Sequence, residues 1–147
     1  MTVTNSEHPA HVAGKRSREA AMARDKEAWL ALFADDAIVE DPVGPSHFDP
    51  EGKGHRGKEA IAAFFDKAIA PSELQFNFVE TFQCGNEEAN VGNIVIKAAG
   101  YQVTAAGVFT YRVDDEGKIV ALRAYWELDR ATAVSYTHLT LPTILRV

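Results

Sequence analysis

The hydrophobic pattern of the chain changes its period once, at Pro71. Before Pro71, apolar side chains recur three and four positions apart, as at Ile61, Phe64 and Ala68, which is typical of a helix with one buried face. After Pro71, apolar and polar residues alternate, which is typical of strands. Helices followed by a run of strands predict an α+β domain, with the helices covering one face of a mainly antiparallel sheet.

Turn-forming residues such as Asn86, Gly100 and the segment 114–117 divide the second half into strands. These strands are long enough to need curvature, so a sheet wrapped over three helices leaves an open-ended apolar cone. The predicted helices run from about His11 to Arg24, from the capping residue Asp25 to Phe33, and from Gly57 to Pro71, and the predicted strands span about 37–41, 74–83, 89–99, 101–113 and 118–128.

The length of 147 residues, 46% of them hydrophobic, predicts one globular domain. Residues 1–10 are polar and unpatterned, and we interpret them as a flexible leader before a single domain at 11–133. Residues 134–147 resemble the conceptual translation of an adapter used in transposon-based sequencing libraries, and we exclude them from functional reasoning. The alternative is a natural tail rich in Thr, Leu and Pro.

The formal net charge of -6 and the absence of a basic patch argue against nucleic acid and anionic membranes as partners. No apolar run reaches the length of a membrane span, and the first residues lack the apolar core of a signal peptide. The single cysteine, Cys84, excludes an internal disulfide and is expected to be a small buried residue. These features predict a cytoplasmic protein.

A carboxylate follows the first predicted strand, immediately before Pro42. Alternate side chains of a strand share a face, which directs Ala37, Val39 and Asp41 toward the interior and Glu40 to the opposite side. The residue before a proline favours extended backbone, so the strand end would aim the Asp41 carboxylate inward. The alternative is that Asp41 and Pro42 form an ordinary turn with the carboxylate in water.

Four segments carry a resemblance to ketosteroid isomerase, a family with the nuclear transport factor 2-like fold, which also includes SnoaL-like polyketide cyclases. The resemblance implies a cone-shaped fold with three N-terminal helices packed in a strongly curved sheet. It extends over about residues 12–128, and the segments that carry it are Phe33–Ala37, Val39–Gly44, the helix Gly57–Phe65, and Val108–Trp126.

The resemblance implies that Asp41 is the general base, which carries a proton between two carbons of a steroid. The family's two oxyanion donors, a Tyr and an Asp, fall on Ser17 and Gly107, so the oxyanion hole departs from the family pattern. For an aromatic replacement, the alternative role is that of a structural ring in the core. The groups that could replace the missing donors are the hydroxyl of Ser17, the indole N–H of Trp126 and the phenols of Tyr101 and Tyr111.

We expect the cone to hold a small hydrophobic, steroid-like ligand and to raise the pKa of Asp41 by desolvation. No cofactor is expected, because no Gly-rich phosphate-binding loop follows a strand. No metal site is expected either, because the spacing of His47, Asp49, Glu51 and His55 in one loop matches no strong ligand motif. The residues expected to contact the ligand are Val39, Phe65, Gly107, Phe109 and Trp126.

The resulting prediction is a steroid delta-isomerase-like enzyme with Asp41 as base and a non-standard oxyanion hole. The alternatives are a module that binds a hydrophobic ligand without chemistry, and a SnoaL-like polyketide cyclase.

The last strand is apolar on both faces, which predicts a homodimer through the outer face of the sheet. Arg123 would pair across that interface or lie at its rim. The two faces carry Ile119, Ala121 and Tyr125 on one side, and Leu122, Ala124 and Trp126 on the other.

Overall fold

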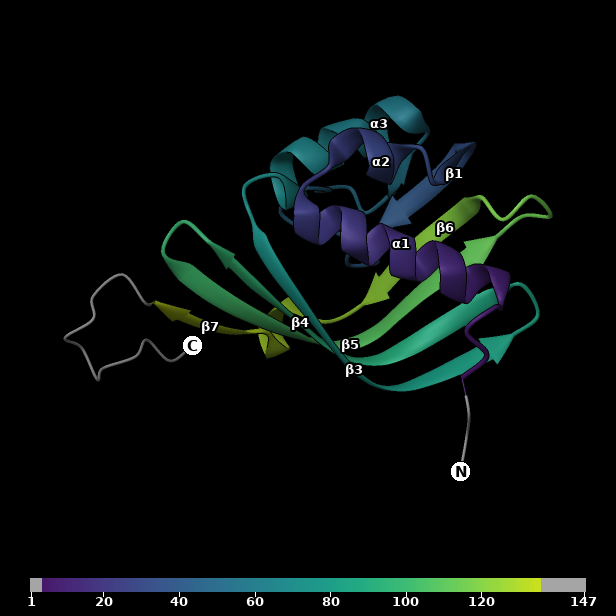
Figure 1. The fold of residues 1–147 in the computed structure, drawn as a ribbon. Helices are drawn as coiled ribbons and strands as arrows, with labels where there is room; N and C mark the ends of the chain where they lie inside the picture. Colours follow the sequence, from purple (N-terminus) through teal and green to yellow (C-terminus); the bar gives the residue numbers. More distant parts are fainter. Residues whose placement is uncertain (1–3, 136–147) are drawn as a thin grey trace.

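The computed structural model describes residues 4–135, and these form the predicted α+β domain (Figure 1). The predicted elements are confirmed to within a few residues at most ends, and the short strands β2 and β7 were not predicted. The helices are α1 (Pro9–Ala23), α2 (Lys26–Leu30) and α3 (Lys58–Phe64), which continues as a π-helical turn, η1 (Phe65–Ile69). The strands are β1 (Phe33–Glu40), β2 (His55–Arg56), β3 (Glu73–Cys84), β4 (Glu87–Ala98), β5 (Tyr101–Val113), β6 (Ile119–Tyr125) and β7 (Thr132–Ser135), with a 3-10 turn, η2 (Leu128–Arg130), before β7.

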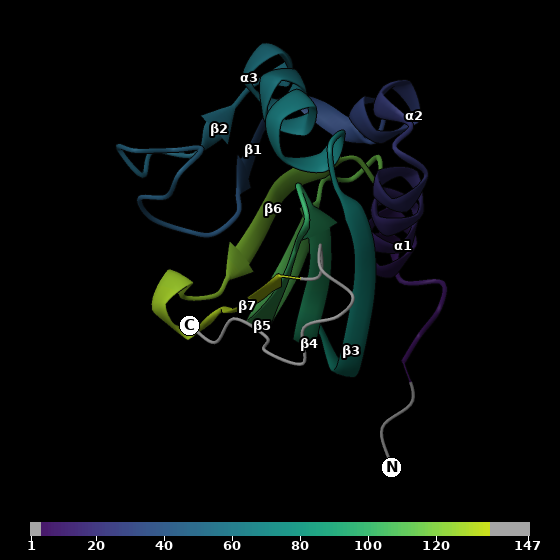
Figure 2. The same cartoon turned by 90° about the vertical axis from the view of Figure 1, so that its left-hand side faces the viewer.

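One seven-stranded sheet has the order β2-β1-β6-β5-β4-β3, and β7 pairs with β5. The pairing of β1 with β6 is parallel, whereas every other pair is antiparallel. The long strands bend strongly, and the three helices lie on the concave side of the sheet (Figures 1 and 2). The cone predicted from the sequence is therefore confirmed.

Aromatic packing joins α2 and η1 to the sheet. The ring centroid of Trp29 lies 4.6 Å from that of Phe33 and 5.4 Å from that of Phe65, and all three side chains are almost fully buried. Burying an aromatic side chain of this size contributes about 1.5–3 kcal/mol to folding. This cluster closes the interior behind β1 and leaves the rest of the concave face free for a cavity.

The predicted end of the second helix at Phe33 is wrong, because α2 ends at Leu30 and Phe33 begins β1. Phe33 pairs with Ile119 of β6, and the Ile119 N–H donates to the Leu32 carbonyl at 2.9 Å. This strand pairing between distant parts of the chain overrides the local helical pattern. The Phe33 side chain still packs on Trp29, as its helical spacing predicted.

The predicted outer-face position of Ile119 is also wrong, because its side chain is fully buried in the core. The pairing of β5 with β6 shifts register between Arg112 and Val113. An irregularity in register changes which side chains face the core, and strict alternation cannot anticipate it.

The boundary predicted at residue 10 differs from the structure. Helix α1 begins at Pro9, the Ala10 side chain is fully buried, and the backbone N–H of Asn5 donates to Gln83 at 3.1 Å. Residues 1–3 of the proposed leader and 136–147 of the proposed adapter-derived tail lie outside the described residues. Cys84 is exposed at the end of β3, so its predicted burial is wrong.

Across residues 4–135, the structure contains no helix that is long and apolar enough to span a membrane. The same residues contain no group of three His, Cys, Asp or Glu side chains placed to bind a metal. In the loop that raised this question, the Asp49 carboxylate accepts hydrogen bonds from the backbone N–H groups of Lys53 and Gly54, at 3.3 and 2.8 Å. Asp49 therefore shapes the loop.

Candidate active site

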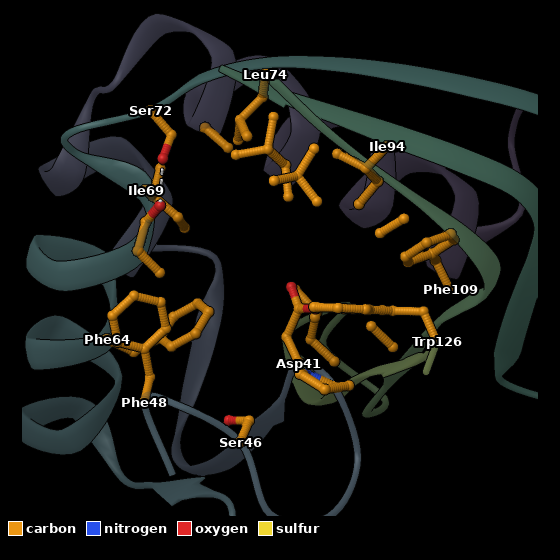
Figure 3. A pocket seen from close by; sticks show the side chains of 18 of the residues that line it. Asp41, Ser46, Phe48, Phe64, Ile69, Ser72, Leu74, Ile94, Phe109 and Trp126 are labelled. Atoms are coloured by element: carbon orange, nitrogen blue, oxygen red, sulfur yellow. Dashed lines mark hydrogen bonds between the residues drawn. The ribbon is translucent and has the colours of Figure 1, made fainter. Parts of the chain in front are cut away.

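A cavity of about 400 Å³ lies between the helices and the concave face of the sheet (Figure 3). Its volume is within the range of about 300–1,000 Å³ that is usual for small-molecule pockets. Apolar side chains from α3, η1, β3, β4 and β5 form most of its wall, among them Phe64, Ile69, Leu74, Ile94 and Phe109. Such a wall suits a hydrophobic ligand, and the few polar groups within it determine what chemistry the cavity can support.

Asp41 lies directly after β1, and its carboxylate points into this cavity (Figure 3). The indole Nε1–H of Trp126 donates to Asp41 Oδ1 at 2.7 Å. The peptide bond between Asp41 and Pro42 is cis. Just beyond it, the Val43 N–H donates to the Ala124 carbonyl at 2.8 Å, which attaches this segment to β6. The carboxylate is therefore fixed beside the end of β6, and its predicted inward orientation is what the structure has.

Burial raises the pKa of Asp41 from its ordinary value of 3.8 to about 6, although the hydrogen bond from Trp126 opposes the increase. The side chain is half-buried, and Figure 3 shows its carboxylate facing the cavity. A carboxylate with this pKa is mostly ionised at neutral pH, yet it accepts a proton more readily than an ordinary Asp.

Ser17 faces the same cavity from α1, and its side chain is buried. Its hydroxyl oxygen accepts a hydrogen bond from the Trp29 Nε1–H at 3.1 Å. Within the part of the chain that the structure describes, no hydrogen bond uses the Ser17 O–H as a donor. This O–H can therefore donate to a ligand in the cavity.

Tyr111 reaches the cavity from β5 and is also buried. Burial raises the pKa of its phenol, the guanidinium of Arg18 opposes that increase, and the carboxylates of Asp41 and Glu88 add to it. The phenol therefore stays protonated at neutral pH and is available as a hydrogen-bond donor. Of the two tyrosines named from the sequence, only Tyr111 lies at the cavity, because Tyr101 is exposed near the other end of β5 and does not line it.

The remaining residues named from the sequence divide into two groups. Phe109 and Trp126 line the cavity, whereas Val39 and Phe65 are buried in the core and do not line it. Gly107 does not line it either, and a Cβ added there would collide with the carbonyl oxygen of Tyr125. The strand position matched to the family's acidic donor therefore has no room for a side chain.

Two charged or polar groups have partners that the sequence did not reveal. The Trp126 N–H, considered above as a donor to the ligand, is already bonded to Asp41. Arg123 Nε donates to Glu40 Oε1 at 2.7 Å within the same chain, so the structure has this pair where the sequence suggested a contact across an interface. Both pairs join the end of β1 to β6, one on each face of the sheet.

Sequence reasoning missed several wall residues. Phe64 and Ile69 follow the helical pattern, and Leu74 and Ile94 follow the strand alternation, so these patterns could have identified them. Phe48 lies in the loop between β1 and β2, where no periodic signal exists.

The fold and the cavity together define a class of protein: an α+β cone in which Asp41 is the one acidic side chain among the described residues of an apolar wall. The SnoaL-like domain family matches residues 15–122. The chain therefore belongs to this family, and its fold is nuclear transport factor 2-like.

Individual relatives agree with this assignment. A steroid Delta-isomerase of Nocardioides simplex is 27% identical over 99 residues, which are 67% of this chain and 74% of the relative. The solved Delta 5-3-ketosteroid isomerase from Mycobacterium sp. is 42% identical, with a TM-score of 0.79, over 86% of this chain and 98% of the other. A Mycobacterium tuberculosis protein solved in complex with estradiol-17beta-hemisuccinate is 42% identical, with a TM-score of 0.81, over 86% and 99% of the two chains.

Replacing Asp41 by Asn should stabilise the protein at neutral pH. A raised carboxyl pKa means that ionising the folded protein costs free energy, and the change from 3.8 to about 6 corresponds to about 3 kcal/mol above the higher value. The Asn oxygen can still accept from Trp126. We expect the gain in denaturant unfolding to disappear below the lower value, where both states are protonated.

The matched control is Asp36→Asn, which removes one negative charge from an exposed position of the same strand. A gain in stability for Asp41→Asn that is the same at both ends of the pH range, or no gain at all, would contradict the raised pKa.

Proposed function

We propose that this protein is a steroid delta-isomerase-like enzyme in which Asp41 is the general base. Asp41 would remove a proton from the carbon between a ketone and a carbon–carbon double bond, and return it to the far carbon of that double bond. One C–H bond breaks, another forms, and the double bond moves into conjugation without any exchange of electrons with a cofactor. The observation that carries this proposal is the ionisable carboxylate held inside an apolar cavity.

The environment of Asp41 suits this role. A general base is most effective when its pKa lies near the working pH, and burial raises the pKa of Asp41 to about 6. The hydrogen bond from Trp126 fixes the carboxylate without protonating it. Proton removal from carbon needs this combination of basicity and fixed geometry.

The negative charge that develops on the ketone oxygen needs hydrogen-bond donors. Ser17 and Tyr111 are the candidates, because both line the cavity and neither hydroxyl donates to another group within the described residues. They come from α1 and β5, so the proposed oxyanion hole joins a helix to the sheet. This arrangement would replace the pattern of the family, whose acidic donor falls on Gly107.

A steroid-like ligand is supported by the apolar wall and by the relatives. One solved relative is a ketosteroid isomerase, and another was solved with estradiol-17beta-hemisuccinate. The ligand-binding contacts that we propose are Phe109 and Trp126 from the original set, together with Phe64, Ile69, Leu74 and Ile94.

A non-catalytic binding module is the second candidate. It is favoured by Gly107, because the position matched to the acidic donor has no side chain and no room for one. A SnoaL-like polyketide cyclase is a third, supported by the family match, and would use the same carboxylate to assist ring closure.

We also propose a cytoplasmic location, which the sequence predicts from the single cysteine. Cys84 is free and exposed, and an exposed free thiol is typical of a reducing compartment.

Steroid isomerisation should depend on Asp41. With a 3-keto-5-ene steroid followed by ultraviolet absorbance, we expect Asp41→Asn to lower turnover by at least about a hundredfold while steroid binding is retained. For the unmodified protein, kcat/KM should increase with pH through about 6 and then level off, because the base must be ionised.

Asp36→Asn is again the control and should isomerise normally. Equal turnover by the protein and by Asp41→Asn would remove Asp41 from the mechanism. Binding without turnover in both would favour the non-catalytic module.

A homodimer through the outer face of the sheet stays part of the proposal. Two neighbouring rows of cross-strand partners on that face carry Phe82 and Tyr125, which are 50% and 42% exposed. Exposed aromatic side chains above apolar strand positions are typical of an interface. The two rows are Phe82, Ala89, Thr110 and Arg123, and Glu80, Val91, Val108 and Tyr125.

Light scattering at micromolar concentration should therefore report a mass twice that of the chain, and Phe82→Glu should reduce it to the mass of the chain. Met22→Glu, at an exposed position of α1, is the matched control and should leave the mass unchanged. A monomer in the unmodified protein would refute the dimer.

A further inference from the structure

One face of α1 is shaped to receive Tyr111. Gly14, Ser17 and Arg18 lie three and four positions apart, so their side chains share this face. A Cβ at Gly14 would lie 2.8 Å from Cδ2 of Tyr111, so the glycine allows the ring to lie against the helix. One turn later, the Cζ atom of Arg18 lies 5.5 Å from the centre of the same ring.

Arg18 has an unusual environment for a cation. Its guanidinium also lies over Phe78, with Cζ 5.1 Å from the ring centre. Nη1 is buried and has no hydrogen-bond partner, and no salt bridge of the described residues includes Arg18. Burying a donor of a charged group without a partner is costly. The two aromatic contacts offset only part of that cost, so the placement of Arg18 suggests a use beyond packing.

Three charged groups face the phenol of Tyr111. Arg18 approaches from α1, Asp41 lines the same cavity, and Glu88 is the direct cross-strand partner of Tyr111 on β4. Glu88 is fully buried, and its Oε2 binds His11 Nδ1 at 2.7 Å and Gln83 Nε2 at 2.8 Å. The two carboxylates oppose further negative charge near the phenol, and Arg18 is the cation that counters them.

We propose that Arg18 is a positioning residue, whose guanidinium packs on the Tyr111 ring and strengthens its phenol as a hydrogen-bond donor to a negatively charged ligand oxygen. The proposal rests on the function proposed above, in which such charge develops on the ketone oxygen. As that charge develops, the Tyr111 O–H donates more strongly because a cation lies behind it. The proton stays on Tyr111, and no bond of the phenol breaks.

A binding experiment tests this without any need for turnover. In the Asp41→Asn background, which removes the competing carboxylate charge, affinities for 4-nitrophenolate and for nitrobenzene are measured at mildly alkaline pH. Arg18→Met keeps an unbranched side chain of similar length and should weaken nitrophenolate binding by about tenfold. Nitrobenzene lacks the charged oxygen, so its affinity should change by less than about twofold.

The controls separate charge from packing. Arg18→Lys keeps the charge and should retain most of the nitrophenolate affinity, and Arg16→Met, at an exposed position of the same helix, should have no effect. In a Tyr111→Phe background, Arg18→Met should no longer weaken nitrophenolate binding, because the group through which Arg18 acts is gone. Should Arg18→Met not fold, Glu88→Gln provides an effect of opposite sign, because removing this carboxylate should strengthen nitrophenolate binding several-fold.

Equal losses for both ligands, or an undiminished effect of Arg18→Met in the Tyr111→Phe background, would overturn the proposal. So would unchanged nitrophenolate affinity in Arg18→Met or in Glu88→Gln. An active isomerase with any of these results would leave the function of Asp41 intact and remove only the role of Arg18. A protein without isomerase activity that gives the expected affinities would instead retain Arg18 and Tyr111 as a binding feature.

Discussion

The hydrogen bond from Trp126 to Asp41 is the interaction on which the proposed site depends. It joins the residue that follows β1 to the residue that follows β6, and it gives a carboxylate in an apolar cavity a fixed orientation. Burial raises the pKa of Asp41 and the Trp126 N–H limits that rise. The result is a carboxylate that is ionised at neutral pH and still basic, which an exposed Asp would not be.

The sheet brings these two residues together through its one parallel pairing. Glu40 of β1 lies opposite Arg123 of β6, and their side chains form an ion pair on the outer face. One residue further along β1, the Asp41 side chain is on the inner face, where Trp126 meets it. The same sheet presents Tyr111 from β5, and α1 adds Ser17 across the cavity. Base and donors therefore come from different elements, which the curvature of the sheet holds around one ligand-sized space.

Local patterns in the sequence were sufficient for the fold class and for the candidate base. The change of period at Pro71 predicted helices followed by strands, and the alternation before Pro42 predicted an inward Asp41. Local patterns failed where distant strands decide the outcome: Phe33 left its predicted helix to pair with Ile119 of β6. Depth along a strand was equally hidden. Tyr101 and Tyr111 stand at opposite ends of β5, and only the curvature of the folded sheet determines which one reaches the cavity.

The central claim is that the cavity makes Asp41 a base poised near neutral pH, and a direct titration of its carboxyl carbon by nuclear magnetic resonance tests it. The signal is assigned by its loss in Asp41→Asn and followed in the folded, ligand-free protein. We expect a pKa of about 6, and a higher value in Trp126→Phe because the opposing hydrogen bond is gone. Titration of Asp41 at its ordinary value of 3.8, unchanged in Trp126→Phe, would contradict the account.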